Sequence, residues 1–370
     1  MLFYKYRRWI LLILLLNLLI QWRQLAIVAQ ENPDFDFIFN LDRDTVVYAD
    51  LSTSTVQTFD LPIIAATMDV SPKENYTVVF ASRDQRLCVW GSNGQMISCL
   101  PENLSHYREP VWASDGESFW IGASEADDTR VILHIRVSDG AVLHRIEHDL
   151  IYKDHGHTPA YRDLSLVHDL VVSTNGAYVY LASLQDLAIV KIITINDLIP
   201  RGQSDYLRFS PNGEVLAMII ACHAQECERQ HRLAFYDFAA DKFEFYDIAI
   251  DRERYAHLKG PFWSPDGNTI ALTAIDVEKS TPELTDDYVT LLFDISTHSF
   301  AILNRDRYEL GGVQWSPDGQ YLASVGCYPY GECKITIFDL DGNTFEVGVF
   351  ELDWDFVGSG WIPAGWIDNS

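Results

Sequence analysis

Basic residues are scarce in this sequence, and their scarcity narrows what the protein can bind. The 370 residues include 27 lysines and arginines against 53 aspartates and glutamates, a formal net charge of −26 at pH 7. Such a surface repels the phosphates of nucleic acids and anionic lipid headgroups. We therefore expect no nucleic-acid partner. The simplest interpretation of the acidity is solubility outside the cell.

Signatures of several enzyme classes are also missing. There is no Gly-x-Ser-x-Gly nucleophile elbow, no His-Glu-x-x-His zinc helix, no phosphate-binding loop and no defensible Ser-His-Asp arrangement. His155 and His157 lack a standard metal-ligand spacing. The segment Asp339-Leu-Asp341-Gly-Asn343 lacks the third acidic position and the distal glutamate of a calcium loop, so a structural turn explains it better. We expect no catalytic residue, no metal ion and no cofactor.

Long apolar runs are confined to the N-terminus. The run from Trp9 to Ile20 follows a basic stretch and precedes Ile27-Val28-Ala29, a suitable signal-peptidase site. It is short for a membrane-spanning helix. Residues 1–29 are therefore expected to be a cleaved signal peptide or, alternatively, a retained anchor formed by residues 9–20. Either way, residues 30–370 form one domain that is secreted, periplasmic or displayed at the cell surface.

The six cysteines fall into three close pairs. An even number in an exported chain favours disulfides, and the pair spacings do not suit a zinc site. Two of the pairs lie at nearly the same distance after a repeated motif described below, which predicts the same hairpin staple twice. The expected bonds are Cys88–Cys99, Cys222–Cys227 and Cys327–Cys333.

One motif recurs along the chain. Its best copies are Trp263-Ser-Pro-Asp-Gly267 and Trp315-Ser-Pro-Asp-Gly319, in which proline fixes φ, aspartate bonds its own backbone and glycine accepts a positive φ. Looser copies begin at Val70, Trp112, Val172, Phe209 and Trp361. The gaps of 42, 60, 37, 54, 52 and 46 residues average about 48, the period of a four-stranded propeller blade.

Strand-like runs around the motif give each blade an order a, b, c, d, with strand a ending at the motif's first residue. The run Leu187–Ile195 is expected to be strand c of the third blade, whose strand d is hard to identify. Runs near the N-terminus lack a strand a, and Trp361 ends a strand a that lacks its blade, so the two termini complete one composite blade. The sequence thus predicts an all-β propeller of seven four-stranded blades, with six or eight left open by the uneven gaps.

The motif, followed by an apolar strand and then a strand that ends in aspartate, resembles the repeat of TolB-like propellers, which are related to WD40-like repeats. The resemblance covers about residues 35–365. It implies a periplasmic interaction scaffold or the propeller half of a peptidase. The peptidase alternative fails because no hydrolase domain follows and the nucleophile elbow is missing.

The strand order separates two ends of the expected ring. The a–b and c–d turns lie at one end, here called the turn end, and the b–c and d–a connections lie at the other, the loop end. The longest insertions map to the loop end: 148–164, 221–231, 251–258, 276–287 and 326–333. Length variation confined to one end is typical of a binding face.

Arginines and tyrosines are expected to line the loop end. They lie a few residues ahead of strand a in three successive blades, as Arg201 with Tyr206, Arg254 with Tyr255, and Arg307 with Tyr308. Such a rim could bind an anionic or sugar-like ligand by bidentate hydrogen bonds and stacking. Alternatively, neighbouring carboxylates neutralise the arginines locally.

These observations favour an exported, non-catalytic scaffold that binds a protein, a peptide or a glycan at its loop end. The alternative is a propeller enzyme of the lyase or glycosidase type, with its site at the mouth of the central channel. Because propellers support both, the fold by itself does not decide between them. Membrane association is expected only through an uncleaved N-terminal segment.

Overall fold

The structure, a computed structural model, describes part of the chain. It covers residues 35–368 apart from 41–44, 51–54, 61–64, 72–75, 82–85, 92–94, 101–103, 106–109, 114, 126–128, 148–159, 187, 201, 223–230, 249–254, 277–286, 307–308, 328–331 and 352–363. The predicted targeting segment lies outside these residues. Within them, no helix is long and apolar enough to cross a membrane.

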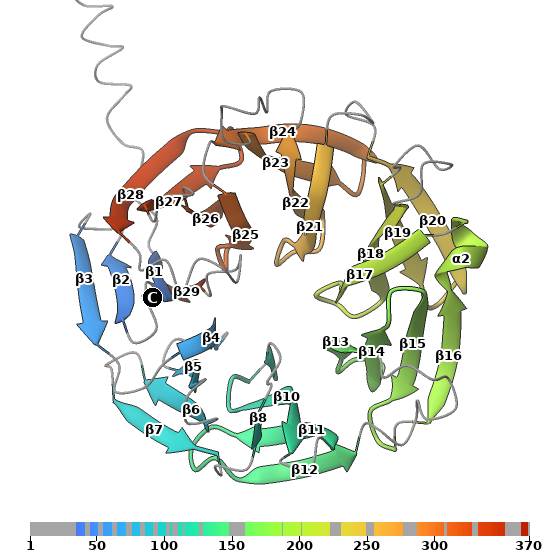
Figure 1. The fold of residues 1–370 in the computed structure, drawn as a ribbon, viewed down its shortest axis with the longest axis horizontal. Coiled ribbons are helices and arrows are strands. Elements are labelled where there is room, and N and C mark those ends of the chain that lie inside the picture. The colour runs from blue at the N-terminus through green and yellow to red at the C-terminus, as the bar shows by residue number, and fades with distance from the viewer. Residues whose placement is uncertain are drawn as a thin grey trace, which may run out of the picture.

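The described residues fold almost entirely into antiparallel strands that form seven sheets around a central opening (Figure 1). Six sheets have four strands and one has five. Sheets 1 to 3, numbered along the chain, contain β4 (Ala65–Val70), β5 (Tyr76–Ala81), β6 (Arg86–Gly91) and β7 (Met96–Cys99); β8 (Leu104–Ser105), β9 (Val111–Trp112), β10 (Ser118–Glu125), β11 (Arg130–Arg136) and β12 (Val142–Glu147); and β13 (Ala160–Ser165), β14 (Leu170–Thr174), β15 (Tyr178–Ser183) and β16 (Ile189–Thr194). The all-β prediction is confirmed.

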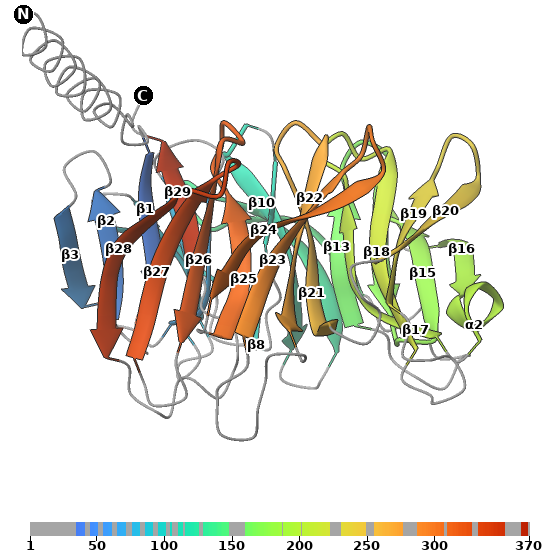
Figure 2. The same ribbon diagram turned by 90° about the horizontal axis from the view of Figure 1, so that it is seen from above.

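Sheets 4 to 6 continue the ring with four strands each, and a short helix, α2 (Ile195–Leu198), precedes them. Their strands are β17 (Gly202–Phe209), β18 (Val215–Cys222), β19 (His231–Asp237) and β20 (Lys242–Asp247); β21 (Tyr255–Trp263), β22 (Thr269–Asp276), β23 (Asp287–Asp294) and β24 (Ser299–Asp306); and β25 (Glu309–Trp315), β26 (Tyr321–Cys327), β27 (Glu332–Asp339) and β28 (Thr344–Glu351). Seen from the side, their strands run between the two ends of the ring (Figure 2).

The closing sheet joins the two ends of the chain. Its strand order is β29 (Ala364–Asp368), β1 (Phe35–Asn40), β2 (Thr45–Asp50) and β3 (Thr55–Asp60). The register sets Phe37 opposite Trp366 and Phe39 opposite Ala364. As the sequence predicts, the C-terminal strand supplies the strand that the N-terminal hairpin lacks.

The hydrophobic core lies between successive sheets. One cluster joins sheets 3 and 4 through Val172, Leu181, Met218 and other fully buried side chains. Similar clusters join sheet 1 to 2, 2 to 3, 4 to 5 and 5 to 6. Because each sheet is buried on both faces by its neighbours, its strands are apolar on both sides, unlike the strands of a sheet that faces water.

The motif tryptophans also connect sheets by hydrogen bonds. The indole nitrogen of Trp263 in β21 donates to the carbonyl oxygen of Arg208 in β17, at 3.2 Å. The indole of Trp315 in β25 donates to the carbonyl oxygen of Phe262 in β21, at 3.0 Å. A tryptophan at the end of the innermost strand therefore fixes one sheet against the sheet before it, which explains why the motif begins with an aromatic residue.

The third motif copy is assigned wrongly by the sequence. Val172 lies in β14, and the turn after it, with Gly176, joins the second and third strands of sheet 3 at the loop end. The turn equivalent to Ser-Pro-Asn-Gly213 is instead 165–169, because a Cβ added to Gly213 would lie 2.6 Å from Ser165 Oγ. Gly267 and Gly319 face Pro211 and Pro265, the same position one sheet back.

This correction moves every strand of sheet 3 outward by one place. Its innermost strand is β13, part of the predicted insertion 148–164, and the predicted strand c, 187–195, is the outermost strand β16. Starting the motif at Leu164 replaces the gaps of 60 and 37 residues with 52 and 45. Local chemistry hid this turn, because it has no proline or glycine and Asp169 takes the positive φ of 52°.

Sheet 2 departs from the four-stranded prediction. Its innermost strand is split in two, and both β8 and β9 pair with β10, at Ser124–Glu125 and at Phe119–Trp120 respectively. Pro110 stands just before β9 and has no N–H to donate to the ladder, which favours an interruption there.

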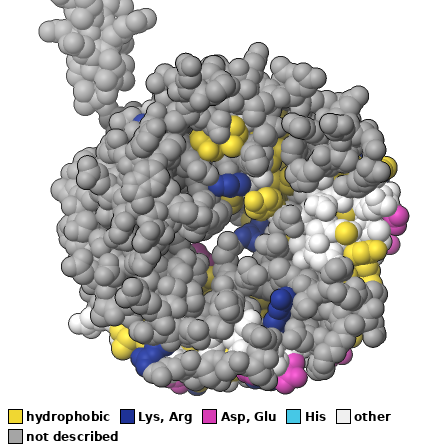
Figure 3. Space-filling model, in the orientation of Figure 1, with side chains coloured by type: hydrophobic (Ala, Val, Ile, Leu, Met, Phe, Trp, Pro, Cys, Tyr) yellow, Lys and Arg dark blue, Asp and Glu magenta, His cyan; other side chains and the backbone are white. Residues whose placement is uncertain are grey.

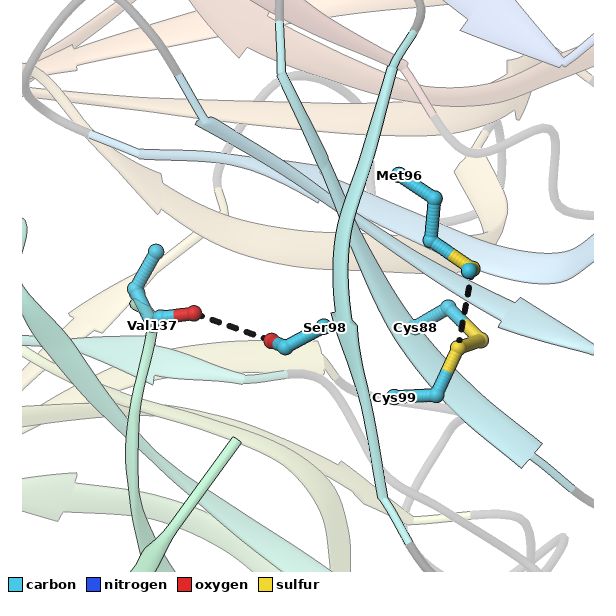
Figure 4. The surroundings of a disulfide bond; sticks show 5 residues. All are labelled: Cys88, Met96, Ser98, Cys99 and Val137. Atoms are coloured by element: carbon cyan, nitrogen blue, oxygen red, sulfur yellow. Dashed lines mark hydrogen bonds between the residues drawn. A yellow bond between two sulfur atoms is a disulfide. The ribbon is translucent and has the colours of Figure 1, made fainter. Parts of the chain in front are cut away.

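The cysteines differ in how far the structure tests them. Cys88 and Cys99 face each other across β6 and β7 and form a disulfide, with Cα atoms 4.0 Å apart (Figure 4). The thioether sulfur of Met96 lies 3.2 Å from Cys99 Sγ. Beside the disulfide, Ser98 Oγ donates to Val137 O in the next sheet, at 2.9 Å. The backbones of Cys327 and Cys333 are also directly opposed. Their bond, like Cys222–Cys227, stays a prediction.

Replacing Cys88 and Cys99 together by serine is expected to lower the free energy of unfolding by about 2–3 kcal/mol, because the bond closes a short loop of the unfolded chain. Urea denaturation under oxidising conditions measures the loss. Wild-type protein in reductant should show at least the same loss. No difference between variant and oxidised wild type would contradict the prediction.

Candidate functional site

The strand bounds confirm that connection length differs between the two ends of the ring. At the turn end, the connections after the innermost strands are as short as 166–169, 264–268 and 316–320. At the loop end, the strands leave 148–159, 223–230, 277–286 and 352–363 between them. One predicted insertion, 326–333, is largely strand, because β26 ends at Cys327 and β27 begins at Glu332.

The predicted arginine and tyrosine rim lies mostly outside the described residues. This holds for Arg201, Arg254, Arg307 and Tyr308, and for the side chain of Tyr255, the first residue of β21. Tyr206 lies in β17, the innermost strand of sheet 4, where 43% of it is exposed. The rim therefore stays a prediction, with one described tyrosine exposed on an inner strand.

Basic side chains beside the central opening were missed by the sequence analysis (Figure 3). Arg208 and Lys259 are half-buried on β17 and β21, the innermost strands of sheets 4 and 5. Arg208 Nη1 donates to the carbonyl oxygen of Leu207, at 3.3 Å. The sequence search considered connections and not strands, although the inner strands surround the opening. In an acidic protein, these cations give the channel wall a local charge opposite to that of the whole.

Asp163 has a structural role that the sequence did not indicate. Its buried carboxylate accepts a hydrogen bond from the amide of Leu164 at 2.9 Å and one from the amide of Phe209, in the next sheet, at 2.8 Å. In sheet 1, Asp69 likewise accepts from the amide of Val70. The shared pattern, aspartate before the apolar residue that ends the innermost strand, was the available signal for β13.

The repeated turn carboxylates are occupied by their own turns. Asp266 accepts hydrogen bonds from Ser264 Oγ at 2.6 Å and from the amide of Asn268 at 3.0 Å, and these bonds lower its pKa. Asp318 repeats the pattern with Ser316. Asp339, the first residue of the calcium-like segment, accepts from the amides of Asp341 and Asn343. That segment is therefore a turn.

Asp294 allows a test by pH. Hydrogen bonds from Ser296 Oγ, then from the amide and hydroxyl of Thr297, lower its pKa from 3.8 to about 2. Because the folded pKa lies below the unfolded value, the stabilisation is present above about pH 4 and is lost as the pH falls toward 2. Replacing Asp294 by asparagine should flatten the pH dependence of the melting temperature in this window. An unchanged acid limb would contradict the assignment.

Two histidines flank a buried tryptophan in sheet 2. The ring of His134 stacks on Trp120 with centroids 4.4 Å apart, and His144 lies edge-on at 6.0 Å. Burial and then the nearby His144 lower the pKa of His134, against an opposing effect of Asp115. Its Nε2 is 2.9 Å from Ser118 Oγ. No group of three or more histidine, cysteine or acidic side chains suited to a metal occurs among the described residues. His155 and His157 lie outside them.

Comparisons with known proteins identify the fold. No family model matches the chain. Among curated proteins, the B chain of chromatin assembly factor 1 from Mus musculus is 24% identical over 131 residues, which are 33% of this chain and 21% of that protein. The Gallus gallus protein of the same name is 26% identical over an equal span. The match thus extends over about a fifth of the length of these relatives.

Solved structures match much more of the chain. The periplasmic gluconolactonase PpgL of Pseudomonas aeruginosa superposes with a TM-score of 0.58, 12% identity and coverage of 86% of this chain and 96% of that one. The Cps50 (Swd1) β-propeller domain of Myceliophteria thermophila gives 0.53, 11%, 78% and 85%. The fold is a WD40-like β-propeller. At these identities the likeness shows the fold alone, so the TolB-like assignment stays a prediction.

Proposed function

We propose that this propeller is an exported, non-catalytic binding scaffold that uses its loop end to hold a protein, a peptide or a glycan. Each sheet then serves as one blade of a seven-bladed ring. The observation that carries the proposal is the difference between the ends: uniform short turns at one, connections of very different length at the other. Loops of variable length on a rigid frame are the usual place for binding residues.

The described chemistry of the turns supports the same proposal. The recurring carboxylates at the turn end are bonded within their own turns, and Asp163 is bonded between sheets. They stabilise the frame and leave recognition to the loop end. The basic residues on the channel wall favour an anionic ligand group close to the axis. The Cys88–Cys99 disulfide and the N-terminal sequence favour an extracytoplasmic location.

The proposal is tested by a thermal-shift screen against uronic acids, neutral sugars and peptides that end in a carboxylate, followed by titration of any compound that binds. Arg254→Ala should weaken an anionic ligand about tenfold, since a hydrogen bond to a charged group contributes about 1.5–3 kcal/mol. Asp318→Asn at the turn end is the matched control. Asparagine already occupies this position in sheet 4, where Asn212 Oδ1 accepts from Ser210 Oγ and the amide of Glu214.

The outcomes separate the two ends of the ring. Weaker binding in the control but not in Arg254→Ala would show that the binding end is assigned wrongly. Turnover of a lactone, a polyuronide or a glycoside by the purified protein would favour the enzymatic alternative, for which the superposition with a periplasmic gluconolactonase provides a reason to assay.

A further inference from the structure

The outer edge of sheet 3 differs from the other described sheet edges in its side chains. β16 is the outermost strand, so the backbone N–H and C=O groups on its far side have no neighbouring strand. Three apolar side chains are exposed along it: Ile189 at 37%, Val190 at 62% and Ile192 at 39%. Exposed apolar edge strands are templates for pairing with another chain, and most proteins protect them with charge.

Other outermost strands have that protection. β12 contains His144, Arg145 and Glu147, and β20 contains Lys242, Glu244 and Asp247. β24 and β28 likewise include charged residues in their sequences. β16 has the sequence Ile-Val-Lys-Ile-Ile-Thr, with Lys191 as its one charge.

The charge of Lys191 is directed away from the exposed side. Its ammonium donates to Tyr236 Oη at 2.8 Å, forms an ion pair with Asp241 and lies 4.6 Å from the centre of the Tyr236 ring. Both partners belong to sheet 4, and Ile193 also packs into the core between sheets 3 and 4. Because side chains alternate along a strand, Val190 and Ile192 project from the opposite face.

Tyr178 extends the apolar surface on that opposite face. The register pairs Tyr178 with Thr194 and Tyr180 with Ile192, so Tyr178 shares a face with Val190 and Ile192. Tyr178 is 40% exposed, and its ring lies 6.2 Å from that of the buried Tyr180. Tyr178, Val190 and Ile192 form what is here called the apolar strip.

Carboxylates surround the apolar strip. Asp186 precedes β16 and Asp197 lies in α2 just after it, both exposed. On the neighbouring sheet 2, Arg145 is bonded to both Glu125 and Glu147, which leaves one negative charge in excess. A partner that covers the strip therefore meets an apolar centre with negative charge at both ends.

We propose that the free edge of β16 accepts one extended segment of a cationic polypeptide, which adds a strand to sheet 3. The segment places β-branched or aromatic side chains against the apolar strip, and lysines or arginines about six to eight residues apart face Asp186 and Asp197. A second copy of this chain fits less well, because antiparallel pairing of two β16 strands would set Asp186 of one copy near Asp197 of the other. This site lies on the outer rim and is independent of the loop-end proposal.

The test uses a fluorescent peptide, KKVTVTVKK, and fluorescence anisotropy with the full-length exported protein. The double substitution Val190→Lys and Ile192→Lys should weaken binding at least about tenfold, because it places like charges opposite the peptide and removes the apolar contact. Phe245→Lys, an equally exposed apolar position on β20, is the matched control and should change binding by less than about twofold. Hydrogen exchange should slow in residues 189–194 when the peptide binds.

Further arms decide between the alternatives. Asp186→Asn with Asp197→Asn, which leaves the strip intact, should weaken binding by about threefold to tenfold and reduce its salt dependence. Equal binding of EEVTVTVEE, or of a proline-interrupted KKVTPTVKK, would overturn strand addition by a cationic segment. So would unchanged affinity in the Val190/Ile192 variant, provided that it melts like wild type. Dimerisation that this variant abolishes would identify a second copy as the occupant instead.

Discussion

Removal of residues 364–370 is expected to abolish cooperative unfolding. This deletion takes away β29, whose five register pairs with β1 join the two ends of the chain. Without it, the closing sheet has a free edge at its innermost strand and the ring is open between sheet 6 and sheet 1. Since domains of this kind are stable by only about 5–15 kcal/mol, the loss of one interface in a closed ring is expected to exceed the margin.

Calorimetry and near-ultraviolet circular dichroism measure this effect. Deletion of Asn369 and Ser370 alone is the matched control, because these residues follow the end of β29. The control should retain a sharp transition near the wild-type temperature. A longer deletion that melted as sharply as the control would show that the ring does not depend on closure by β29.

Replacing Asp163 by alanine is expected to lower the free energy of unfolding by about 3 kcal/mol. The carboxylate accepts from the amides of Leu164 and Phe209 with different oxygens, so its removal leaves two buried N–H groups without this acceptor. Urea denaturation with tryptophan fluorescence measures the loss.

Two further variants make this prediction specific. Asp163→Asn should also destabilise, by about 1–3 kcal/mol, because one of its two positions becomes an NH₂ group that faces a backbone donor. Asp318→Asn should be nearly neutral, since one oxygen of Asp318 accepts from both Ser316 Oγ and the amide of Gln320. Equal stability of wild type and Asp163→Ala would mean that water replaces the carboxylate without cost.

Local turn chemistry explains what could be predicted about the fold. The Trp-Ser-Pro-Asp-Gly copies at 263 and 315 each contain the residues needed for one tight turn, and their spacing gives the blade period. The turn of sheet 3 uses Leu166, Val167, His168 and Asp169 instead, so the sequence pattern matched a similar run nearby. Its position became visible only where Gly213 packs against Ser165.

The candidate site was less predictable for a related reason. The sequence indicates which connections are long, but the chemistry of a site depends on which side chains meet across sheets. Arg208 and Lys259 are 51 positions apart in the numbering, yet both lie on innermost strands beside the channel. Lys191 gives β16 a charge in the sequence, but in the structure Tyr236 and Asp241 bind that charge from the next sheet.

The sequence by itself determined the repeat, the all-β class, the joining of the two termini and the Cys88–Cys99 pair, because each depends on residues close in the chain or on a fixed period. Only the tertiary structure decided the order of strands in sheet 3, the role of Asp163 and the exposed apolar edge of β16. These depend on contacts between successive sheets, where groups about 45 residues apart satisfy or neutralise one another. Spacing along the chain does not encode such pairings.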